Sequence, residues 1–349
     1  MATTVSRPAG PREIALPAPR GPLSERLFTT LVEPPGTPLL RHAGELRVDS
    51  ARPLADEDLQ LALYVAYELH YSGIAGVDAD WEWDPGLLAF RARLERPFEA
   101  AVRAAAGGRA ALATVDPAQV GATLQRLVAE DDGPPLSRWI EAHAELEQVR
   151  EFMIHRSAYQ LKEADPHSWA IPRLAGAPKA ALVEVQADEY GGGDASRVHA
   201  VLFAKAMTAA GLDATYGAYL ERLPAITLAT VNLMSLCGLH RRLRGAIVGH
   251  LAAFEMTSSL PNRRYGNALR RLGLGAEATD FFDEHVAADA VHENIAAWDL
   301  AGGLAAAEPA LAAEIVMGAR ALLALEARWA RHLLAAWERG DSSLRPHSA

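Results

Sequence analysis

A long, largely apolar stretch between two prolines constrains the fold of this chain more than any other feature. It runs from residue 225 to about residue 258, after Pro224 and before Pro261. Such a stretch is typical of a buried helix, and no convincing run of alternating polar and apolar residues indicates strands elsewhere. Ala and Leu are abundant, whereas aromatic and β-branched residues are scarce, which also favours helix over sheet. We therefore predict an all-α protein.

Composition narrows the possible functions. Half of the 349 residues are hydrophobic, enough for one large domain or two ordinary ones, and the net charge of -10 argues against a general nucleic-acid-binding protein. The single cysteine, Cys237, excludes an intramolecular disulfide and a thiolate-rich metal site within one chain. We find no secretory signal and no apolar run long enough to span a bilayer, so we expect a cytoplasmic protein without a membrane partner.

Proline and glycine divide the chain into segments. The Pro-rich residues 1–24 are expected to be disordered or draped over the surface, and residues 341–349 to be a disordered tail. The sequence EDDGPP, at 130–135, is the best candidate for a boundary. It separates a helical N-terminal segment, residues 25–135, from a second helical unit, residues 136–340. Because the first segment holds no cluster of histidines and carboxylates, we expect it to be an association platform, with the protein a homodimer.

Two local expectations concern the helices of the second unit. The stretch that begins at Ser137 reads as one long helix, which Pro166 stops. The glycines at 191–193 break or bend the chain, and Asp194 or Ser196 restarts a helix after them. In the N-terminal segment, we expect the helix that follows Pro85 to be interrupted near Pro97.

The strongest chemical signal is the pattern His285-x-x-x-Asp289-x-x-His292. On a helix these three side chains fall within about 60° of one another, on one face. Two imidazoles and a carboxylate on one stripe suit iron, manganese or zinc. The alternative is a solvated polar stripe, but apolar residues surround this one. The spacing alone leaves both interpretations open.

Further candidate ligands occur singly at helical positions elsewhere: Glu163, Glu189, His199 and Glu255. Taken alone, His199 is more simply a core histidine whose hydrogen bonds are satisfied. Glu255 could pair with the arginine at 263 or 264, and Glu163 could be an exposed helix end. Together, however, carboxylates and histidines from separate helices are what a helical bundle needs to hold two metal ions. No Glu-x-x-His pair of the ferritin type fits, so the ions would be held differently.

Other polar residues fit a metal site less well. Glu68 and His70, at i and i+2, face opposite sides of a helix, which favours a structural or interface role. Glu151 and His155, at i and i+4, could bind a metal, but a hydrogen bond is the simpler interpretation. His250 precedes Glu255 by five positions, which places it off that helix face.

Four motifs together resemble a known family. They are YQLKEADPHSWAIPRL, VEVQADEYGGGDASRVHAVLF, FEMTSSLPNRRYG and HVAADAVH, and they resemble the haem-oxygenase-like di-iron oxidases, often labelled iron-containing redox enzymes. The resemblance covers about residues 140–340 and implies a haem-oxygenase-like helical bundle with an N-terminal helical extension. Carried over position by position, it implies these metal ligands: Glu163, His199, Glu255, His285, Asp289 and His292, with Glu189 as an additional, mobile carboxylate.

The resemblance also implies an activity. A member of this family would be a non-haem di-iron oxidase or oxygenase, with two Fe(II)/Fe(III) ions, O₂ as co-substrate and an external reductant as electron donor. The family includes fatty-acid decarboxylases, amino-acid lyases and N-oxygenases, so membership does not name the substrate. We expect N- or C-oxidation of a small, amino-acid-derived metabolite in a biosynthetic pathway. The alternatives are a metal-free acid–base enzyme of the same fold and a non-enzymatic iron-binding or interaction protein.

Glu189 raises a separate question, because a regular helix would place it about 80° away from His199. It reaches the metals only if the following glycines distort the chain. We therefore expect Glu189 to stand apart from the other ligands in the resting or metal-free protein and to join them when iron is oxidised. The alternative is a surface acid at a helix end.

Overall fold

The computed structural model describes residues 13–40, 48, 50–108 and 115–346. Within these ranges the chain forms helices and no strand, apart from one isolated parallel bridge between Ile14 and Ile74. The predicted all-α fold is therefore confirmed. In the same part of the chain, no helix combines the length and the apolar character that crossing a membrane requires.

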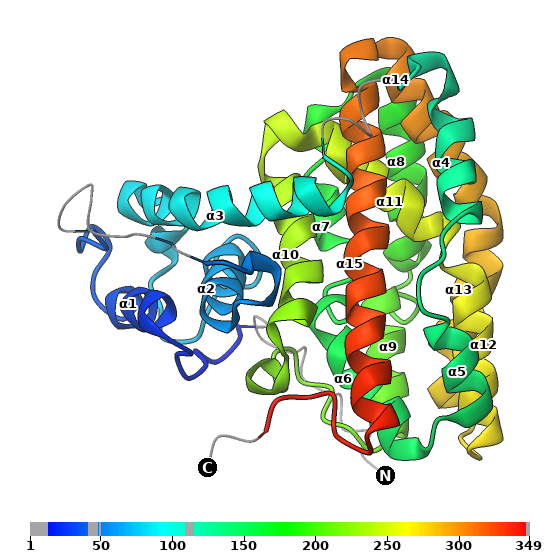
Figure 1. The fold of residues 1–349 in the computed structure, drawn as a ribbon, viewed down its shortest axis with the longest axis horizontal. Coiled ribbons are helices and arrows are strands. Elements are labelled where there is room, and N and C mark those ends of the chain that lie inside the picture. Colours follow the sequence, from blue (N-terminus) through cyan, green and yellow to red (C-terminus); the bar gives the residue numbers. More distant parts are fainter. Residues whose placement is uncertain (1–12, 41–47, 49, 109–114, 347–349) are drawn as a thin grey trace, which may run out of the picture.

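The helices form two groups, which we call the N-terminal group and the bundle (Figure 1). The N-terminal group contains α1 (Pro22–Leu31), α2 (Glu57–Glu68) and α3 (Pro85–Ala105), with short 3₁₀ turns at Pro53–Ala55 and Ala79–Trp83. The bundle contains α4 (Val120–Ala129), α5 (Leu136–His143), α6 (Leu146–Gln160), α7 (Asp165–Ser168), α8 (Gly176–Glu189), α9 (His199–Ala209), α10 (Ala225–Leu239), α11 (Arg244–Met256), α12 (Ser259–Arg271), α13 (Ala276–Asn294), α14 (Gly303–Ala307) and α15 (Ala312–Glu338). A π-helical stretch, η9 (Ile295–Gly302), joins α13 to α14.

The centre of the bundle is the contact between α11 and α15, which lie against each other along their length. Two glycines make this approach possible. A Cβ at Gly249 would lie 1.8 Å from the carbonyl oxygen of Ile315, and one at Gly318 would lie 1.9 Å from that of Ala246. No larger residue fits where the two helix backbones touch.

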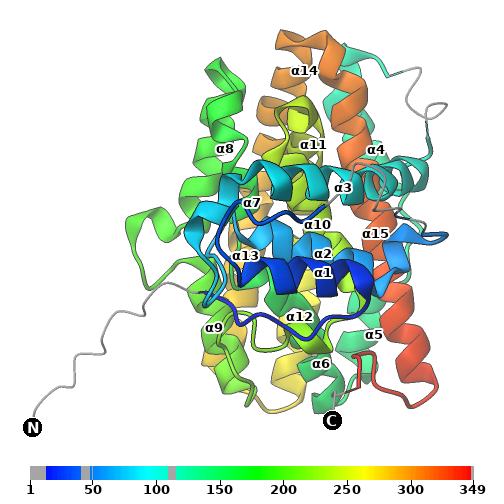
Figure 2. The ribbon, with the colours of Figure 1, turned by 90° about the vertical axis from the view of Figure 1, so that its left-hand side faces the viewer.

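The N-terminal group lies across one side of the bundle, with α2 packed against α10 (Figure 2). Buried apolar residues of both groups belong to one continuous core. α4 packs against α11, α15 and η9, so it belongs to the bundle. The change from one group to the other therefore falls between α3 and α4, before the predicted boundary at 130–135.

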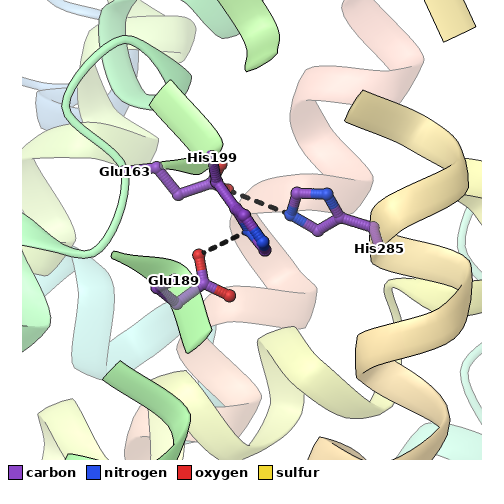
Figure 3. A group of neighbouring side chains, drawn as sticks. All are labelled: Glu163, Glu189, His199 and His285. Atoms are coloured by element: carbon purple, nitrogen blue, oxygen red, sulfur yellow. Dashed lines mark ion pairs between the residues drawn. The ribbon is translucent and has the colours of Figure 1, made fainter. Parts of the chain in front are cut away.

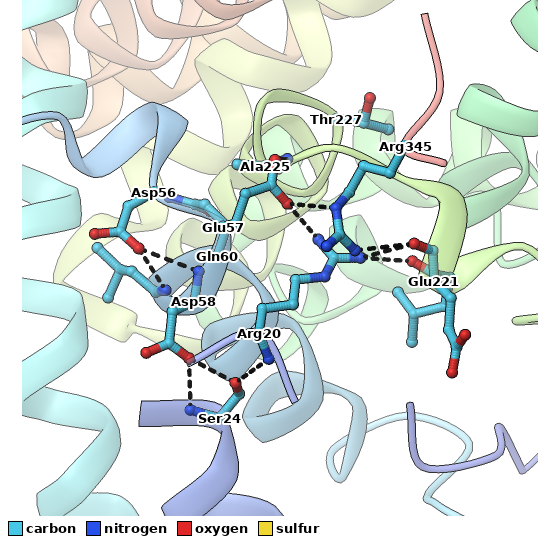
Figure 4. A network of polar contacts seen from close by, with 12 residues as sticks. Arg20, Ser24, Asp56, Glu57, Asp58, Gln60, Glu221, Ala225, Thr227 and Arg345 are labelled. Atoms are coloured by element: carbon cyan, nitrogen blue, oxygen red, sulfur yellow. Dashed lines mark hydrogen bonds and ion pairs between the residues drawn. The ribbon is translucent and has the colours of Figure 1, made fainter. Parts of the chain in front are cut away.

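Polar contacts fix the two ends of the described chain. The guanidinium of Arg20, almost fully buried, pairs with Glu57 at 2.7 Å, and Arg345 approaches the same carboxylate at 3.3 Å (Figure 4). The carboxylate of Asp58 accepts hydrogen bonds from the backbone N–H groups of Leu23 and Ser24. In the described ranges, residues 13–24 and 341–346 thus make defined contacts with the rest of the chain. Residues 1–12 and 347–349 lie outside the described ranges.

Several helices differ from the sequence expectation. The apolar stretch after Pro224 is two helices, α10 and α11, separated by a 3₁₀ turn at Arg241–Leu243, and α12 runs through Pro261. α3 continues through Pro97 without interruption. The predicted long helix from Ser137 to Pro166 is instead α5, α6 and a turn at residues 161–164. A reciprocal pair of hydrogen bonds between Glu145 and Gln148 starts α6 afresh, as a capping box does. α6 ends at Gln160, so Glu163 lies on the turn that follows and not on a helix.

Candidate metal centre

Four of the predicted ligand residues meet inside the bundle (Figure 3). Glu163 comes from the turn before α7, Glu189 is the last residue of α8, His199 is the first residue of α9, and His285 lies on α13. Each offers one ligand atom, and these four atoms lie within 4.8 Å of one another. All four side chains are buried. We call them the first group.

A second group lies beside the first and shares one residue with it. Glu189, Glu255 of α11 and His292 of α13 also place one ligand atom each within 4.8 Å of one another, and all three are buried. His285 and His292, seven residues apart on α13, thus serve different groups. A carboxylate common to two groups has the arrangement required to bridge two metal ions.

Glu189 reaches both groups because the chain turns sharply after it. Gly191, Gly192 and Gly193 all have positive φ angles, between 60° and 91°, which glycine adopts without strain. This turn brings Oε2 of Glu189 to 3.0 Å from Nδ1 of His199. The predicted distortion by the glycines is therefore present. In this structure Glu189 lies beside the other candidate ligands, because α9 begins opposite the end of α8. Its expected movement when iron is oxidised stays a prediction.

Two of the histidine rings are held by one nitrogen and present the other to the cluster. The Nδ1–H of His285 donates to the carbonyl of Phe281 at 2.8 Å, and its Nε2 lies 3.6 Å from Oε1 of Glu163. His292 contacts Asp188 through Nε2 at 3.0 Å, and its Nδ1 lies 3.4 Å from Oε2 of Glu255. Metal-binding histidines are commonly oriented in this way by a carbonyl or a carboxylate. The sequence analysis missed this role for Asp188, although it adjoins Glu189.

One carboxylate of the cluster, that of Glu163, lacks the partners that burial normally requires. No described residue donates a hydrogen bond to either carboxylate oxygen of Glu163. Burial raises the pKa of Glu163 and of Glu255 above the ordinary value. Burial acts in the same direction on Glu189, but its interaction with His199 outweighs this and lowers the pKa. Buried carboxylates without donors are costly, and a bound divalent cation would offset that cost.

The donor set fits iron. Together the two groups offer three imidazoles and three carboxylates, a mixture of nitrogen and oxygen donors that suits Fe, Mn or Zn. Asp289 lies on α13 between His285 and His292, as predicted, but its side chain lies outside the described part of the structure. Its assignment as a ligand stays a prediction.

A pair of buried histidines beside the cluster was not assigned to the site from the sequence. Nε2 of His167 lies 3.1 Å from Nδ1 of His250, and no described residue gives Nδ1 of His167 a hydrogen bond. His167 lines a small cavity together with Glu189, Glu255 and His285. Burial lowers the pKa of His167 to about 4, so its ring is neutral at pH 7. The motif EADPHSW contains this histidine four residues after Glu163, which could have singled it out.

A larger cavity, of about 570 Å³, is lined in part by aromatic residues close to the cluster. These residues are Phe203, Phe254 and Phe281, each one close to a residue of the cluster in sequence or in space. The ring of Phe281 lies 4.3 Å from that of His285 and 4.9 Å from that of Phe203. The cavity thus lies next to the cluster and has space for a small molecule.

Comparison with known proteins bears on this site. A family model described as iron-containing redox enzyme matches residues 150–327, about half of the chain. The matched region begins in α6, ends in α15 and contains every residue of both groups. A search of curated proteins gives no match.

Proposed function

Because this chain belongs to the iron-containing redox enzymes, we propose that the two groups hold two iron ions and that the protein is an O₂-activating, non-haem di-iron oxidase or oxygenase. The observation that carries this proposal is the place of Glu189 in both groups. A single metal site needs no shared carboxylate, whereas two adjacent ions are commonly bridged by one.

Each proposed ion would be held by a different set of residues of the cluster, with one residue common to both sets. Glu163, His199 and His285 would hold one ion, Glu255 and His292 the other, and Glu189 would contact both. When bound there, ferrous ions supply electrons for the reduction of O₂. The contacts of His285 with Phe281 and of His292 with Asp188 would orient these two rings toward the ions.

The 570 Å³ cavity is our candidate for the substrate site, since ligand pockets usually measure about 300–1,000 Å³. Its lining includes an ion pair between Arg156 and Glu326, with a shortest distance of 2.7 Å. The guanidinium of Arg156 also stacks on the ring of Trp329, 4.0 Å from its centroid. A paired cation and anion beside aromatic rings match the carboxylate and amine of an amino-acid-derived molecule. The reaction would be an N- or C-oxidation of that molecule.

The remaining partners follow from the balance of the reaction. Insertion of one oxygen atom into the substrate leaves the other to become water, which takes two electrons and two protons. An external electron donor is therefore part of the proposal. The neutral ring of His167 can form one further hydrogen bond, through Nδ1, inside the small cavity beside the cluster.

We retain the homodimer as a prediction, which the size of the full-length protein in solution would test.

Rapid mixing with O₂ tests the proposed activity. Protein loaded anaerobically with Fe(II) should consume O₂ much faster than free Fe(II) at the same concentration, and the variant His285→Ala should not. Activity of the iron-free protein would favour the acid–base alternative. Binding of iron without faster O₂ consumption would leave an iron-binding protein that is not an enzyme.

A further inference from the structure

Lys162 and Glu163 are neighbours on the turn between α6 and α7, and their side chains have different surroundings. Glu163 belongs to the first group of the metal centre, whereas Lys162 contacts the N-terminal group of helices. The ammonium of Lys162 lies 2.7 Å from Oε2 of Glu68, which belongs to α2. Glu68 is 0% exposed and Lys162 is 3% exposed, so this ion pair is sealed from solvent.

Three tyrosines enclose the ion pair. The ammonium of Lys162 lies 4.3 to 5.7 Å from the ring centroids of Tyr71, Tyr64 and Tyr216. The hydroxyl of Tyr216 also donates to Oε2 of Glu68 at 2.8 Å. Tyr216 lies on the segment between α9 and α10, whereas Tyr64 lies on α2. The enclosure therefore fixes the turn at residues 161–164 to the N-terminal group through charge, hydrogen bonds and ring contacts together.

The turn that carries Glu163 needs this support. Ala164 has a φ of 72°, in the left-handed region, and it is the only residue other than glycine with a positive φ in the described ranges. Such a conformation persists where the surroundings hold it. On the bundle side, the amide of Gln186 donates to the carbonyl of Ala164 at 2.9 Å. On the opposite side, Lys162 is held by Glu68.

We propose that Glu68 and Lys162 are positioning residues of the metal centre: α2 holds the turn that presents the Glu163 carboxylate to the first group. This inference rests on the metal site proposed above. A buried ion pair gives little net stability, because desolvation offsets much of the attraction, but it does select one geometry. The N-terminal group thus supports the metal centre directly, in addition to any role in association.

Removal of both charges tests the proposal. The double variant Glu68→Gln, Lys162→Met leaves no unpaired buried charge, so we expect it to fold. Anaerobic titration with Co(II), whose visible absorption bands report the number and geometry of its ligands, would follow metal binding. We expect the affinity of the first group to fall by about 10–100-fold, the range for loss of a residue that orients a ligand. The second group should bind Co(II) as in the parent.

Two further variants show whether a loss of Co(II) affinity is specific to the first group. Glu163→Gln identifies which absorption bands belong to the first group. Glu95→Gln is the matched control, because Glu95 is a buried carboxylate of α3 that contacts His240 after α10, and neither helix carries a candidate ligand. We expect the control to bind both Co(II) ions as the parent does. A loss in the control equal to that in the double variant would overturn the inference, since general loosening would then explain both.

The outcomes separate this inference from the proposed function. If Glu163→Gln binds Co(II) as the parent does, the proposed metal site itself is wrong. If Glu163→Gln loses binding but the double variant matches the parent, only the positioning role is overturned. Should the double variant fail to fold, Tyr216→Phe decides instead. It removes one hydrogen bond to Glu68, and we expect a smaller loss of affinity in the same group, whereas unchanged binding would contradict the proposal.

Discussion

Oε2 of Glu189 lies 3.0 Å from Nδ1 of His199, although the two residues are separated by the turn at Gly191–Gly193. This contact closes the first group and leaves Glu189 within reach of Glu255 and His292 in the second group. The turn therefore determines whether the two groups share a carboxylate.

Replacement of Gly191 should disrupt the metal centre. An alanine Cβ at this position would lie 2.8 Å from backbone atoms of Arg197 and Val198, directly before His199. Gly192→Ala is the matched control, since its φ is also positive but no atom lies within 4 Å of the added Cβ. Both variants should lose about 1–2 kcal/mol from the left-handed conformation. Gly191→Ala should lose about 1–3 kcal/mol more and bind less Fe(II). Equal melting temperatures and equal iron contents would contradict this account.

Asp188 should matter for metal binding although we do not expect it to contact a metal. It holds Nε2 of His292 at 3.0 Å, so Asp188→Asn should lower the affinity of the second group by about 10–100-fold. Glu184→Gln, an exposed acid one helical turn earlier on α8, should leave binding unchanged. Isothermal titration with Mn(II) or Fe(II) under anaerobic conditions measures both. If the Asp188→Asn variant binds the metal with the affinity of the parent, Asp188 does not support the site.

The metal-free protein should lose stability in alkaline solution. Burial acts to lower the pKa of His292, but its hydrogen bonds with Glu255 and Asp188 outweigh burial and raise it from 6.5 to about 9. The protonated ring therefore stabilises the folded state fully below pH 6.5, and this contribution disappears as the pH rises through about 9. The difference in melting temperature between the parent and His292→Asn should shrink over this range. A constant difference would show that His292 is not charged in the metal-free protein.

Metal binding should show the opposite dependence on pH. A metal must displace the proton of His292, so the affinity of the second group should rise by about tenfold per pH unit between pH 7 and pH 9. Titrations at several pH values would measure this slope. A flat profile would mean that no proton leaves when the metal binds.

Part of the site could be predicted because helical spacing determines which residues share a face. His285 and His292 on α13 are an example, and both lie in the cluster. Glu163 could be found by resemblance, but its place on a turn could not, because the turn includes Ala164 in a left-handed conformation that tertiary contacts such as that of Gln186 support. The contact between Glu68 and Lys162 spans 94 residues, and no local pattern encodes such a pairing. His167 and Asp188 were missed because their roles depend on tertiary neighbours.

Anaerobic titration with Fe(II) tests the central claim most directly. The parent protein should bind two equivalents of iron per chain, and Glu163→Ala should reduce this to about one, because Glu163 belongs to the first group alone. His292→Ala should likewise impair only the second group. Saturation of the parent at one equivalent, unaffected by Glu163→Ala, would contradict the di-iron centre.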